Sequence, residues 1–380
     1  MNEYKNSKIT YFFQEGRLKK IKSKTPYAKE MFYGYHYFKK NYENVEIVEF
    51  ENNINFFERQ FFKLEKKLRN AFKLPIYWSY ITNRKNYKII KESDFIVSGN
   101  NRVGSAVLPM LFLSKIFNNK ISSLCFVMGL FSRKPRYKFL EYFQKKYLLL
   151  MLSVHDNFIF LSEKEMEYGK INFPSKSKKF HFLPFTVDQE MWKHNLSDDN
   201  KNRIIFVGND GNREYRFVED IVNNLVNQDF TIVSSLIEEN NLKSENYKIY
   251  SGTWGDPKVT DQELNKLYRD AKLTIIPLVN TLQPSGQSVA LQSLSSGTPV
   301  LITHTEGFWD NKNFINEENI FFLKENDLDE WINKINLIFA MNDVEYKKIV
   351  KNGIELINNH YGLENFSTKV EEILFNKDVN

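Results

Sequence analysis

Residues 272–310 read KLTIIPLVNTLQPSGQSVALQSLSSGTPVLITHTEGFWD, and this stretch decides the fold. Its first part, LTIIPLV, is an apolar run rich in β-branched residues, which favours a buried strand. A helix is expected to begin near Val289 and to end at Gly297, because glycine commonly ends a helix. Pro299 then opens a second apolar strand. The stretch therefore predicts a strand–helix–strand unit of a parallel sheet.

The loop between the first strand and the helix has the composition of a phosphate-binding turn. It contains Pro284, Ser285, Gly286, Gln287 and Ser288. The N–H groups in the first turn of a helix have no partner inside the helix, and the helix dipole favours negative charge there. We therefore expect Ser285, Gly286, Gln287 and Ser288 to bind phosphate through N–H and hydroxyl groups.

The same stretch resembles the donor site of nucleotide-sugar glycosyltransferases with the GT-B fold, and more narrowly glycosyltransferase family 4. That family usually carries two glutamates with seven residues between them, then a small residue, a Gly-x-Pro-Val step and a strand. The step is intact at 297–300, whereas the second glutamate position falls on Gln292 and the first on Pro284. The resemblance implies that Gln292 holds the ribose hydroxyls, since an amide can both accept from and donate to a diol. In place of the first glutamate, either Gln283, Gln287 or a first-domain residue acts, or the sugar is held differently.

Other stretches match the family in order along the chain. FIFLSEKEMEYG and KKFHFLPFTVDQEMW resemble the end of the family's first domain, with Thr186 where glycine is usual. IIFVGNDGNREY resembles the opening of its second domain, with Asn209 in place of the usual arginine and with Arg213 and Arg216 as the nearest cations. The resemblance covers about 157–375, and the preceding residues match only in the order of elements.

The alternation of strands and helices predicts an α/β fold with two Rossmann-like domains, which the resemblance places face to face across a cleft. We expect an N-terminal acceptor domain over 1–187 and a linker over 188–202. A nucleotide-sugar domain is expected over 203–359, followed by a C-terminal helix over 360–380. In the resembled family such a helix often crosses back onto the first domain.

Two further expectations concern the start of the first domain. Residues 14–24 are expected to form a loop. Thr25 and Pro26 are expected to begin a helix that runs to about Lys40, because threonine caps a helix and proline fits its first turn.

In the second domain, Arg213 is the candidate cation for the donor's diphosphate. Gly208 and Gly211 flank it and let the loop approach the phosphates closely. With residues 285–288 and Gln292, these residues form the expected donor site.

In the first domain, ligands should gather beyond the carboxyl ends of the strands. Asn101, Arg102 and Gly129 lie in such loops and are the candidate catalytic residues on the acceptor side. Met128 stands where the resembled family often has histidine, which removes one usual contact.

Composition bounds the class of protein. A chain of 380 residues with 42% hydrophobic content suits two domains, and a net charge of +6 is too small to indicate nucleic-acid binding. The longest apolar runs are shorter than the ~20 residues of a membrane-spanning helix, and the N-terminus has no signal-peptide pattern. The single cysteine, Cys125, lies in an apolar run and is expected in the core, which favours a cytoplasmic location.

Two segments combine basic and aromatic residues, 59–73 (RQFFKLEKKLRNAFK) and 133–146 (RKPRYKFLEYFQKK). They are either surface helices with lysine-rich faces or a contact with an anionic membrane surface.

No metal or cofactor is expected. The histidines lack the HxxxH and HxH spacings of metal ligands, and Asp327 and Asp329 open a helix, where capping is their expected role. A nucleophile elbow and a P-loop are both missing from the sequence. The nucleotide-sugar, a UDP- or GDP-sugar, is therefore expected as a donor substrate.

The resemblance implies a hexosyltransferase-type enzyme that moves sugar from a nucleotide-sugar to a lipid-linked or cell-surface glycan. It further implies retention of the anomeric configuration and catalysis without a metal, in the cytoplasm or on the inner face of the membrane. Two alternatives stay open: a non-catalytic subunit that binds nucleotide-sugar, since both glutamates are lost, and a nucleotide-sugar 2-epimerase. The epimerase would need acids and histidines near the diphosphate.

Overall fold

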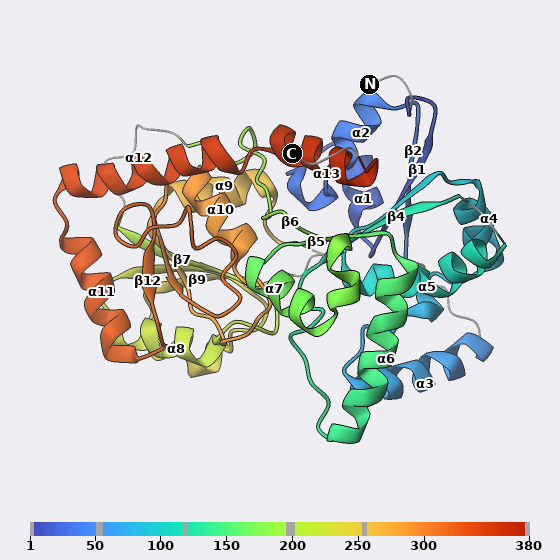
Figure 1. Cartoon of the computed structure of the whole chain (residues 1–380). Coiled ribbons are helices and arrows are strands. Elements are labelled where there is room, and N and C mark those ends of the chain that lie inside the picture. The colour runs from blue at the N-terminus through green and yellow to red at the C-terminus, as the bar shows by residue number, and fades with distance from the viewer. Residues whose placement is uncertain (1–3, 51–55, 118–119, 195–201, 253–256, 377–380) are drawn as a thin grey trace. The chain divides into compact units, whose positions relative to one another are not determined.

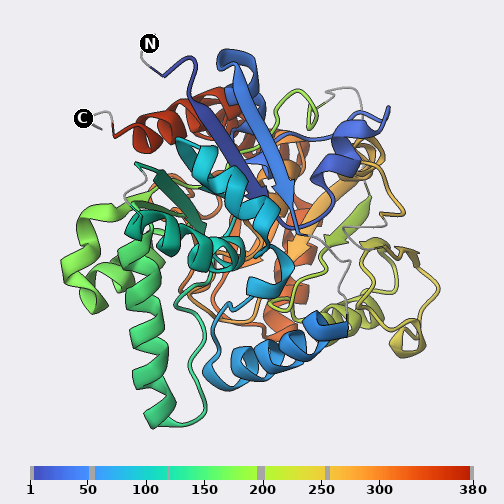
Figure 2. The same ribbon diagram turned by 90° about the vertical axis from the view of Figure 1, so that its right-hand side faces the viewer.

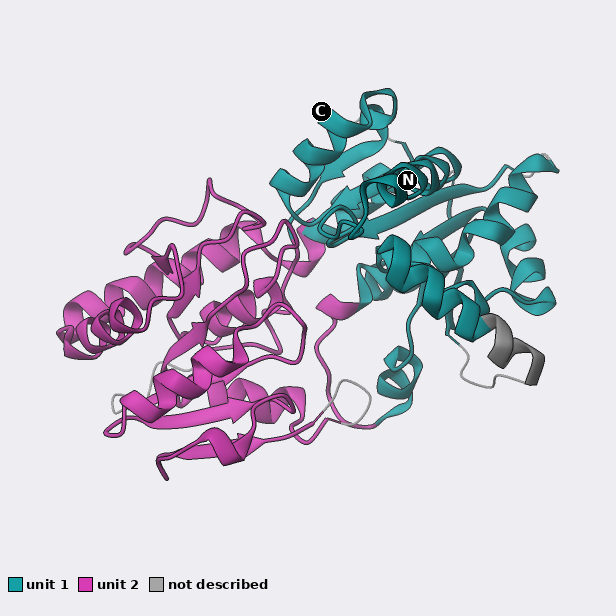
Figure 3. Ribbon diagram, turned by 90° about the horizontal axis from the view of Figure 1, so that it is seen from below, with its two compact units in different colours: residues 1–23, 32–184, 366–380 teal, residues 24–31, 185–365 magenta. Residues whose placement is uncertain are grey.

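The computed structural model describes residues 4–50, 56–117, 120–194, 202–252 and 257–376 (Figure 1). The chain divides into two compact units, which Figure 3 colours separately. Unit 1 comprises Met1–Ser23, Phe32–Pro184 and Phe366–Asn380, and unit 2 comprises Lys24–Met31 and Phe185–Asn365. Residues 195–201 of the expected linker lie outside the described residues.

Unit 1 is built from strands alternating with helices. Its strands are β1 (Lys8–Phe13), β2 (Asn44–Glu49), β3 (Phe95–Ser98), β4 (Ser122–Val127), β5 (Asn157–Phe160) and β6 (Phe180–Phe182). Its helices are α1 (Arg17–Lys22), α2 (Tyr35–Asn41), α3 (Phe56–Phe72), α4 (Arg84–Glu92), α5 (Asn101–Ile116), α6 (Lys138–Val154) and α7 (Glu163–Asn172), with short 3₁₀ turns η2 (Trp78–Tyr80) and η3 (Pro174–Lys179).

The described strands of unit 1 form one six-stranded parallel sheet in the order β2-β1-β3-β4-β5-β6. β3 and β5 are buried along their whole length, as expected for strands covered on both faces by helices. The strand order reverses between β1 and β3. In open α/β sheets, ligands bind at such a reversal, beyond the carboxyl ends of the strands.

The end of the chain completes unit 1. Helix α13 (Leu363–Leu374) lies beside the first strands and α2, as Figures 1 and 2 both show. Asn157 donates to the backbone oxygen of Ile373 at 3.2 Å, and Tyr37 donates to Glu371 at 2.9 Å. The Phe375 ring stacks on Tyr4 with centroids 4.5 Å apart.

Unit 2 has the same alternating architecture. Its strands are β7 (Arg203–Val207), β8 (Asp229–Val233), β9 (Tyr247–Tyr250), β10 (Ala271–Ile276), β11 (Val300–Thr303) and β12 (Phe321–Leu323). Its helices are α8 (Tyr215–Asn224), α9 (Asp261–Arg269), α10 (Gln287–Ser295), α11 (Leu328–Ala340) and α12 (Asp343–His360), with the 3₁₀ turn η4 (Glu239–Asn241).

The described strands of unit 2 form a second six-stranded parallel sheet, ordered β12-β11-β10-β7-β8-β9. Read from β9, this is the order 3-2-1-4-5-6 of a doubly wound nucleotide-binding fold. The order reverses between β7 and β10, so the loops that follow these two strands meet at the place where ligands bind in such sheets.

The strand–helix–strand unit expected within residues 272–310 forms β10, α10 and β11. α10 is buried on nearly every side, because serine and alanine let it approach its neighbours closely. Ser293 shares a hydrogen bond of 2.6 Å with Thr274 on β10 and donates to the oxygen of Thr298 at 2.8 Å. Gly297 ends the helix with a φ of +79°, the conformation that favours glycine.

The start of unit 1 differs from the sequence-based expectation. Residues 17–22 form α1 instead of a loop, and no helix begins at Thr25. The 3₁₀ turn η1 (Glu30–Phe32) ends at Tyr33 and Gly34, whose φ angles of +49° and +86° prevent a continuous helix. Residues 24–31 instead pack within unit 2, and α2 begins only at Tyr35.

Candidate functional site

The loops that follow β7 and β10 are tied together at the reversal of strand order in unit 2. The amide of Val279 donates to the oxygen of Asn212 at 3.0 Å, and that of Glu214 donates to Pro277 at 3.2 Å. The side chain of Asn212 donates to Ser285 Oγ at 2.9 Å. The β7 loop and the turn before α10 therefore form one surface at the carboxyl end of the sheet.

Arg213 lies in this surface with its side chain 2% exposed. Its side chain covers Gly208, where a Cβ would come within 2.9 Å of Nε, so glycine is needed at that position. Nη1 lies 3.1 Å from a carboxylate oxygen of Asp210 but is poorly aligned for a hydrogen bond. Within the described residues, neither Nε nor Nη1 has a hydrogen-bond partner. A buried guanidinium with unused donors is suited to an anionic ligand.

The turn from Ser285 to Ser288 leads directly into α10. Gly286 occupies the position before the helix with a φ of +80°, and no side chain caps the helix there. The first N–H groups of α10 and its dipole therefore remain directed at the loop. Ser285 is 6% exposed and Gln287 is 4% exposed, while Ser288 is half-buried.

Gln292 lies further along α10 and is 7% exposed. Its amide nitrogen donates to a carboxyl oxygen of Glu30 at 2.9 Å, and its amide oxygen accepts from the hydroxyl of Tyr268 at 3.5 Å. Among the described residues, the amide nitrogen therefore makes one short hydrogen bond, and the amide oxygen accepts only a long one.

Glu30 was not singled out from the sequence, although it is the most deeply buried acid near this surface. It is 0% exposed and also accepts from Trp192 Nε1 at 2.7 Å and from the amide of Asp188 at 3.3 Å. Burial raises its pKa to about 7, against hydrogen bonds from Gln292 and Trp192 that lower it. The Asp188 charge adds a smaller upward contribution.

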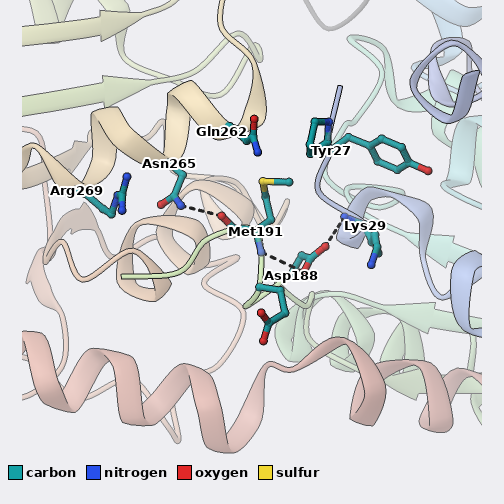
Figure 4. A pocket seen from close by; sticks show the side chains of 9 residues that line it. Tyr27, Lys29, Asp188, Met191, Gln262, Asn265 and Arg269 are labelled. Carbon is teal, nitrogen blue, oxygen red and sulfur yellow. Dashed lines mark hydrogen bonds between the residues drawn. The ribbon is translucent and has the colours of Figure 1, made fainter. Parts of the chain in front are cut away.

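A pocket of about 570 Å³ lies where residues 24–31 meet α9 (Figure 4). It is lined by Pro26, Tyr27, Lys29, Asp188, Glu190, Met191, Gln262, Asn265 and Arg269. Asp188 accepts from the amides of Lys29 and Met191, and Asn265 donates to the oxygen of Met191 at 2.8 Å. These bonds hold residues 24–31 against the rest of unit 2. None of the expected donor residues lines the pocket.

In unit 1, the structure brings two of the three candidate residues together. Asn101 and Arg102 are the first two residues of α5 rather than part of a loop. The side-chain oxygen of Asn101 accepts from the amide of Met128 at 3.3 Å. Gly129 follows, with a φ of +86°. Arg102 is exposed and lies over the Tyr77 ring, with its guanidinium carbon 5.8 Å from the ring centroid.

The amide of Gly129 is already engaged by Glu165, a second buried acid that sequence reasoning missed. Glu165 accepts from the amides of Gly129 at 2.8 Å and Phe131 at 3.0 Å. Burial raises the pKa of Glu165 to about 7, partly offset by these backbone hydrogen bonds. Its contacts lie more than 30 positions away in the sequence, so no local signal indicates them.

Among the described residues, no group of three or more histidine, cysteine or acidic side chains could hold a metal ion. Asp327 caps α11 by accepting from the amide of Glu330 at 2.9 Å, as the sequence predicts. Cys125 is buried in the core of unit 1. In the part of the chain that the structure describes, no helix is long and apolar enough to cross a membrane.

A scan of protein-family models and a search of curated proteins found no match to this chain. Solved structures do match over nearly the whole chain. A glycosyltransferase from Rickettsia africae is 14% identical, with a TM-score of 0.67 over 99% of this chain and 100% of that one. Anabaena HepE, solved with UDP and glucose, is 12% identical, with a TM-score of 0.64 over 97% and 100%. Sucrose-phosphate synthase from Thermosynechococcus elongatus is 13% identical, with a TM-score of 0.66 over 97% and 98%.

The chain has the two-domain α/β fold of GT-B glycosyltransferases. At these sequence identities the similarity shows the fold alone, so the chemistry depends on the residues of this chain's own site.

Proposed function

We propose that this protein transfers a sugar from a nucleotide-sugar donor, with the donor's diphosphate bound beside Arg213 and the start of α10. The observation that carries the proposal is the buried Arg213 guanidinium, whose Nε and Nη1 have no hydrogen-bond partner within the described residues. It lies at the reversal of strand order, next to a helix that no side chain caps. A leaving diphosphate needs this combination of cation, N–H groups and helix dipole.

The comparisons support the same class of substrate. Anabaena HepE was solved with UDP-glucose as well as with UDP and glucose. UDP-sugars are therefore the first donors to test, followed by GDP-, ADP- and CMP-sugars.

The test is a thermal-shift and donor-hydrolysis screen on the wild type, Arg213→Ala and Arg216→Ala. Arg216 is an exposed arginine at the start of α8 and serves as the control. We expect one nucleotide series to stabilise the wild type and Arg216→Ala equally. Loss of charged hydrogen bonds in Arg213→Ala should weaken binding by about 10- to 100-fold, which corresponds to about 1.5–3 kcal/mol.

The screen also separates the rival functions. Binding without any turnover would favour a non-catalytic subunit, and epimerised donor formed without acceptor would favour a 2-epimerase. No stabilisation by any nucleotide would overturn the proposed donor site.

For the chemical step we propose retention without a metal, by resemblance to family 4. The bond between the anomeric carbon and the diphosphate oxygen breaks, the acceptor oxygen forms the new bond, and the departing diphosphate takes the acceptor's proton. Arg213 and α10 would neutralise the diphosphate. Turnover should survive EDTA, and NMR of the first product formed should show the donor's anomeric configuration.

We further propose that the acceptor is presented at an anionic membrane surface, as a lipid-linked sugar or surface glycan. Helix α6 exposes Phe139, Tyr142 and Phe143 by 65%, 61% and 53%, among exposed lysines. Aromatic rings and lysines on one helix are typical of surfaces that bind anionic lipid. The Phe143 ring contacts Phe72 of α3, with centroids 6.1 Å apart, so the basic residues of α3 adjoin this helix.

Flotation with vesicles containing anionic lipid tests this surface. Phe139→Ser with Tyr142→Ser should reduce flotation, as should replacing the exposed lysines 63, 66 and 67 of α3. Leu337→Ser, at an equally exposed apolar position on α11, should not. The side chains of residues 59–61 lie outside the described part of the chain and are left unchanged. Absence of flotation by the wild type would refute the membrane proposal without affecting the donor site.

A further inference from the structure

Glu30 reaches the donor surface from a segment that no donor motif predicts. Residues 24–31 lie between α1 and α2 of unit 1 in the sequence, yet they pack within unit 2. The amide of Ala28 donates to a carboxylate oxygen of Asp261 at 2.8 Å, and that of Lys29 donates to Asp188 at 3.1 Å. These bonds fix the two residues that directly precede Glu30.

The carboxyl group of Glu30 determines how the Gln292 amide is oriented. The same oxygen accepts from Trp192 Nε1 at 2.7 Å and from Gln292 Nε2 at 2.9 Å. An amide has its donors on one side and its acceptor on the other, so a donor turned towards Glu30 turns the oxygen away from it. Within the described part of the chain, that oxygen accepts only the 3.5 Å bond from Tyr268 and keeps acceptor capacity.

We propose that Glu30 is a positioning residue of the donor site, which holds Gln292 so that its amide oxygen accepts from a hydroxyl of the donor's ribose. This inference rests on the proposed function and names a residue pair for one part of that site. An acid and an amide on separate segments would together do the work of a single glutamate on α10. Gln292 retains 7% exposure, close to the 6% of Ser285 in the phosphate loop.

Tyr268 is affected both by the Glu30–Gln292 pair and by Arg213, the cation proposed to bind the diphosphate. Its hydroxyl is fully buried, and burial raises its pKa well above the ordinary value. The charge of Arg213 lowers the same pKa and the charge of Glu30 raises it. Both charges therefore act on the same hydroxyl.

The test exchanges the two groups. In Glu30→Leu, an apolar side chain replaces the carboxyl and offers no acceptor, so the Gln292 amide loses its fixed orientation. In Gln292→Glu, two buried acids face each other, which raises the cost of burying charge. Combining Gln292→Glu with Glu30→Gln restores an acid–amide pair with the groups reversed and places a carboxylate on α10.

The readout is the preference for UDP over 2′-deoxy-UDP and 3′-deoxy-UDP, measured by titration calorimetry. We expect the wild type to bind UDP about tenfold more tightly than at least one of the two deoxy analogues. A tenfold ratio of affinities corresponds to the loss of about one hydrogen bond. The preference should fall at least threefold in Glu30→Leu and in Gln292→Glu, and should return in the double variant Glu30→Gln with Gln292→Glu. Affinity for the deoxy form should change less than twofold in Glu30→Leu.

Trp192→Phe is the matched control, because it removes another donor to the same carboxyl without touching Gln292. It should lower the melting temperature and leave the preference for UDP unchanged. If Glu30→Leu does not fold, the double variant decides: a retained preference supports the inference, and a lost preference overturns it.

Equal preference in the wild type and Glu30→Leu would overturn the inference, as would an equal loss in Trp192→Phe. A wild type that binds UDP without distinguishing the deoxy analogues would also overturn it while leaving the proposed donor site intact. A wild type that binds no nucleotide would instead refute the proposed function, and the inference with it.

Discussion

Among single residues, Glu165 shows how a buried acid links the fold to pH. Burial raises its pKa to about 7 in the folded protein, from the ordinary 4.5. Between these values the folded state keeps a proton that the unfolded state has lost. Stability from this group is therefore largest below about pH 4.5, falls as the pH rises towards 7, and then levels off.

Glu165→Gln removes this titration. We expect the free energy of unfolding to decrease less between pH 5 and pH 7 than in the wild type, by about 1–3 kcal/mol. Urea unfolding at the two pH values measures the difference. Glu163→Gln, an exposed acid at the start of the same helix, should leave the pH dependence as in the wild type. An unchanged pH dependence in Glu165→Gln would show that the carboxyl titrates normally.

At the scale of the elements, the turn that leads into α10 depends on one glycine. Gly286 has a φ of +80°, and a Cβ there would lie 3.0 Å from Ile276 Cγ2 and 3.2 Å from Ile302 Cδ1. Gly286→Ala should lower the free energy of unfolding by about 1–3 kcal/mol, from the left-handed backbone and the close contacts. It should also reduce the thermal shift with UDP, because the first turn of α10 must move.

Gly211→Ala provides the comparison for this element. No atom lies within 4 Å of a Cβ at Gly211, although it belongs to the neighbouring β7 loop. Its free energy of unfolding should stay within about 0.5 kcal/mol of the wild type. Similar stability losses in both variants would mean that the backbone at Gly286 is not constrained as described.

The elements that the sequence predicts well are those with local signals. The apolar runs expected as strands within 272–310 form β10 and β11, and the helix expected between them is α10, followed by Gly297. The placement of Arg213 beside Ser285 could also be anticipated, because parallel strands end at one edge of the sheet.

Residues 24–31 show where local signals fail. Thr25 and Pro26 resemble a helix start, but the segment is fixed by bonds to residues far along the chain, such as that from Ala28 to Asp261. Nothing in the local sequence indicates that Glu30 meets Gln292, because the two are 262 positions apart. The orientation of Gln292 could therefore be found only from the folded chain.

At the scale of the whole molecule, unit 1 depends on residues from both ends of the chain. Residues 366–380 belong to it, although residues 185–365 of unit 2 intervene in the sequence. Phe375 is 6% exposed and packs against Tyr4, with the Phe95 ring 4.7 Å away. The core of unit 1 is consequently complete only when the last helix has been synthesised.

Phe375→Ala should therefore destabilise unit 1 more than unit 2. Removing a buried phenylalanine costs about 3 kcal/mol, because apolar contacts are lost and a cavity remains. Hydrogen exchange should become faster in β1 and β3, while β7 and β10 should exchange as in the wild type. Leu337→Ala, at a position 62% exposed on α11, should alter neither sheet. Unchanged exchange in β1 and β3 would mean that the end of the chain adds little to unit 1. Equally faster exchange in both sheets would mean that the two units unfold as one.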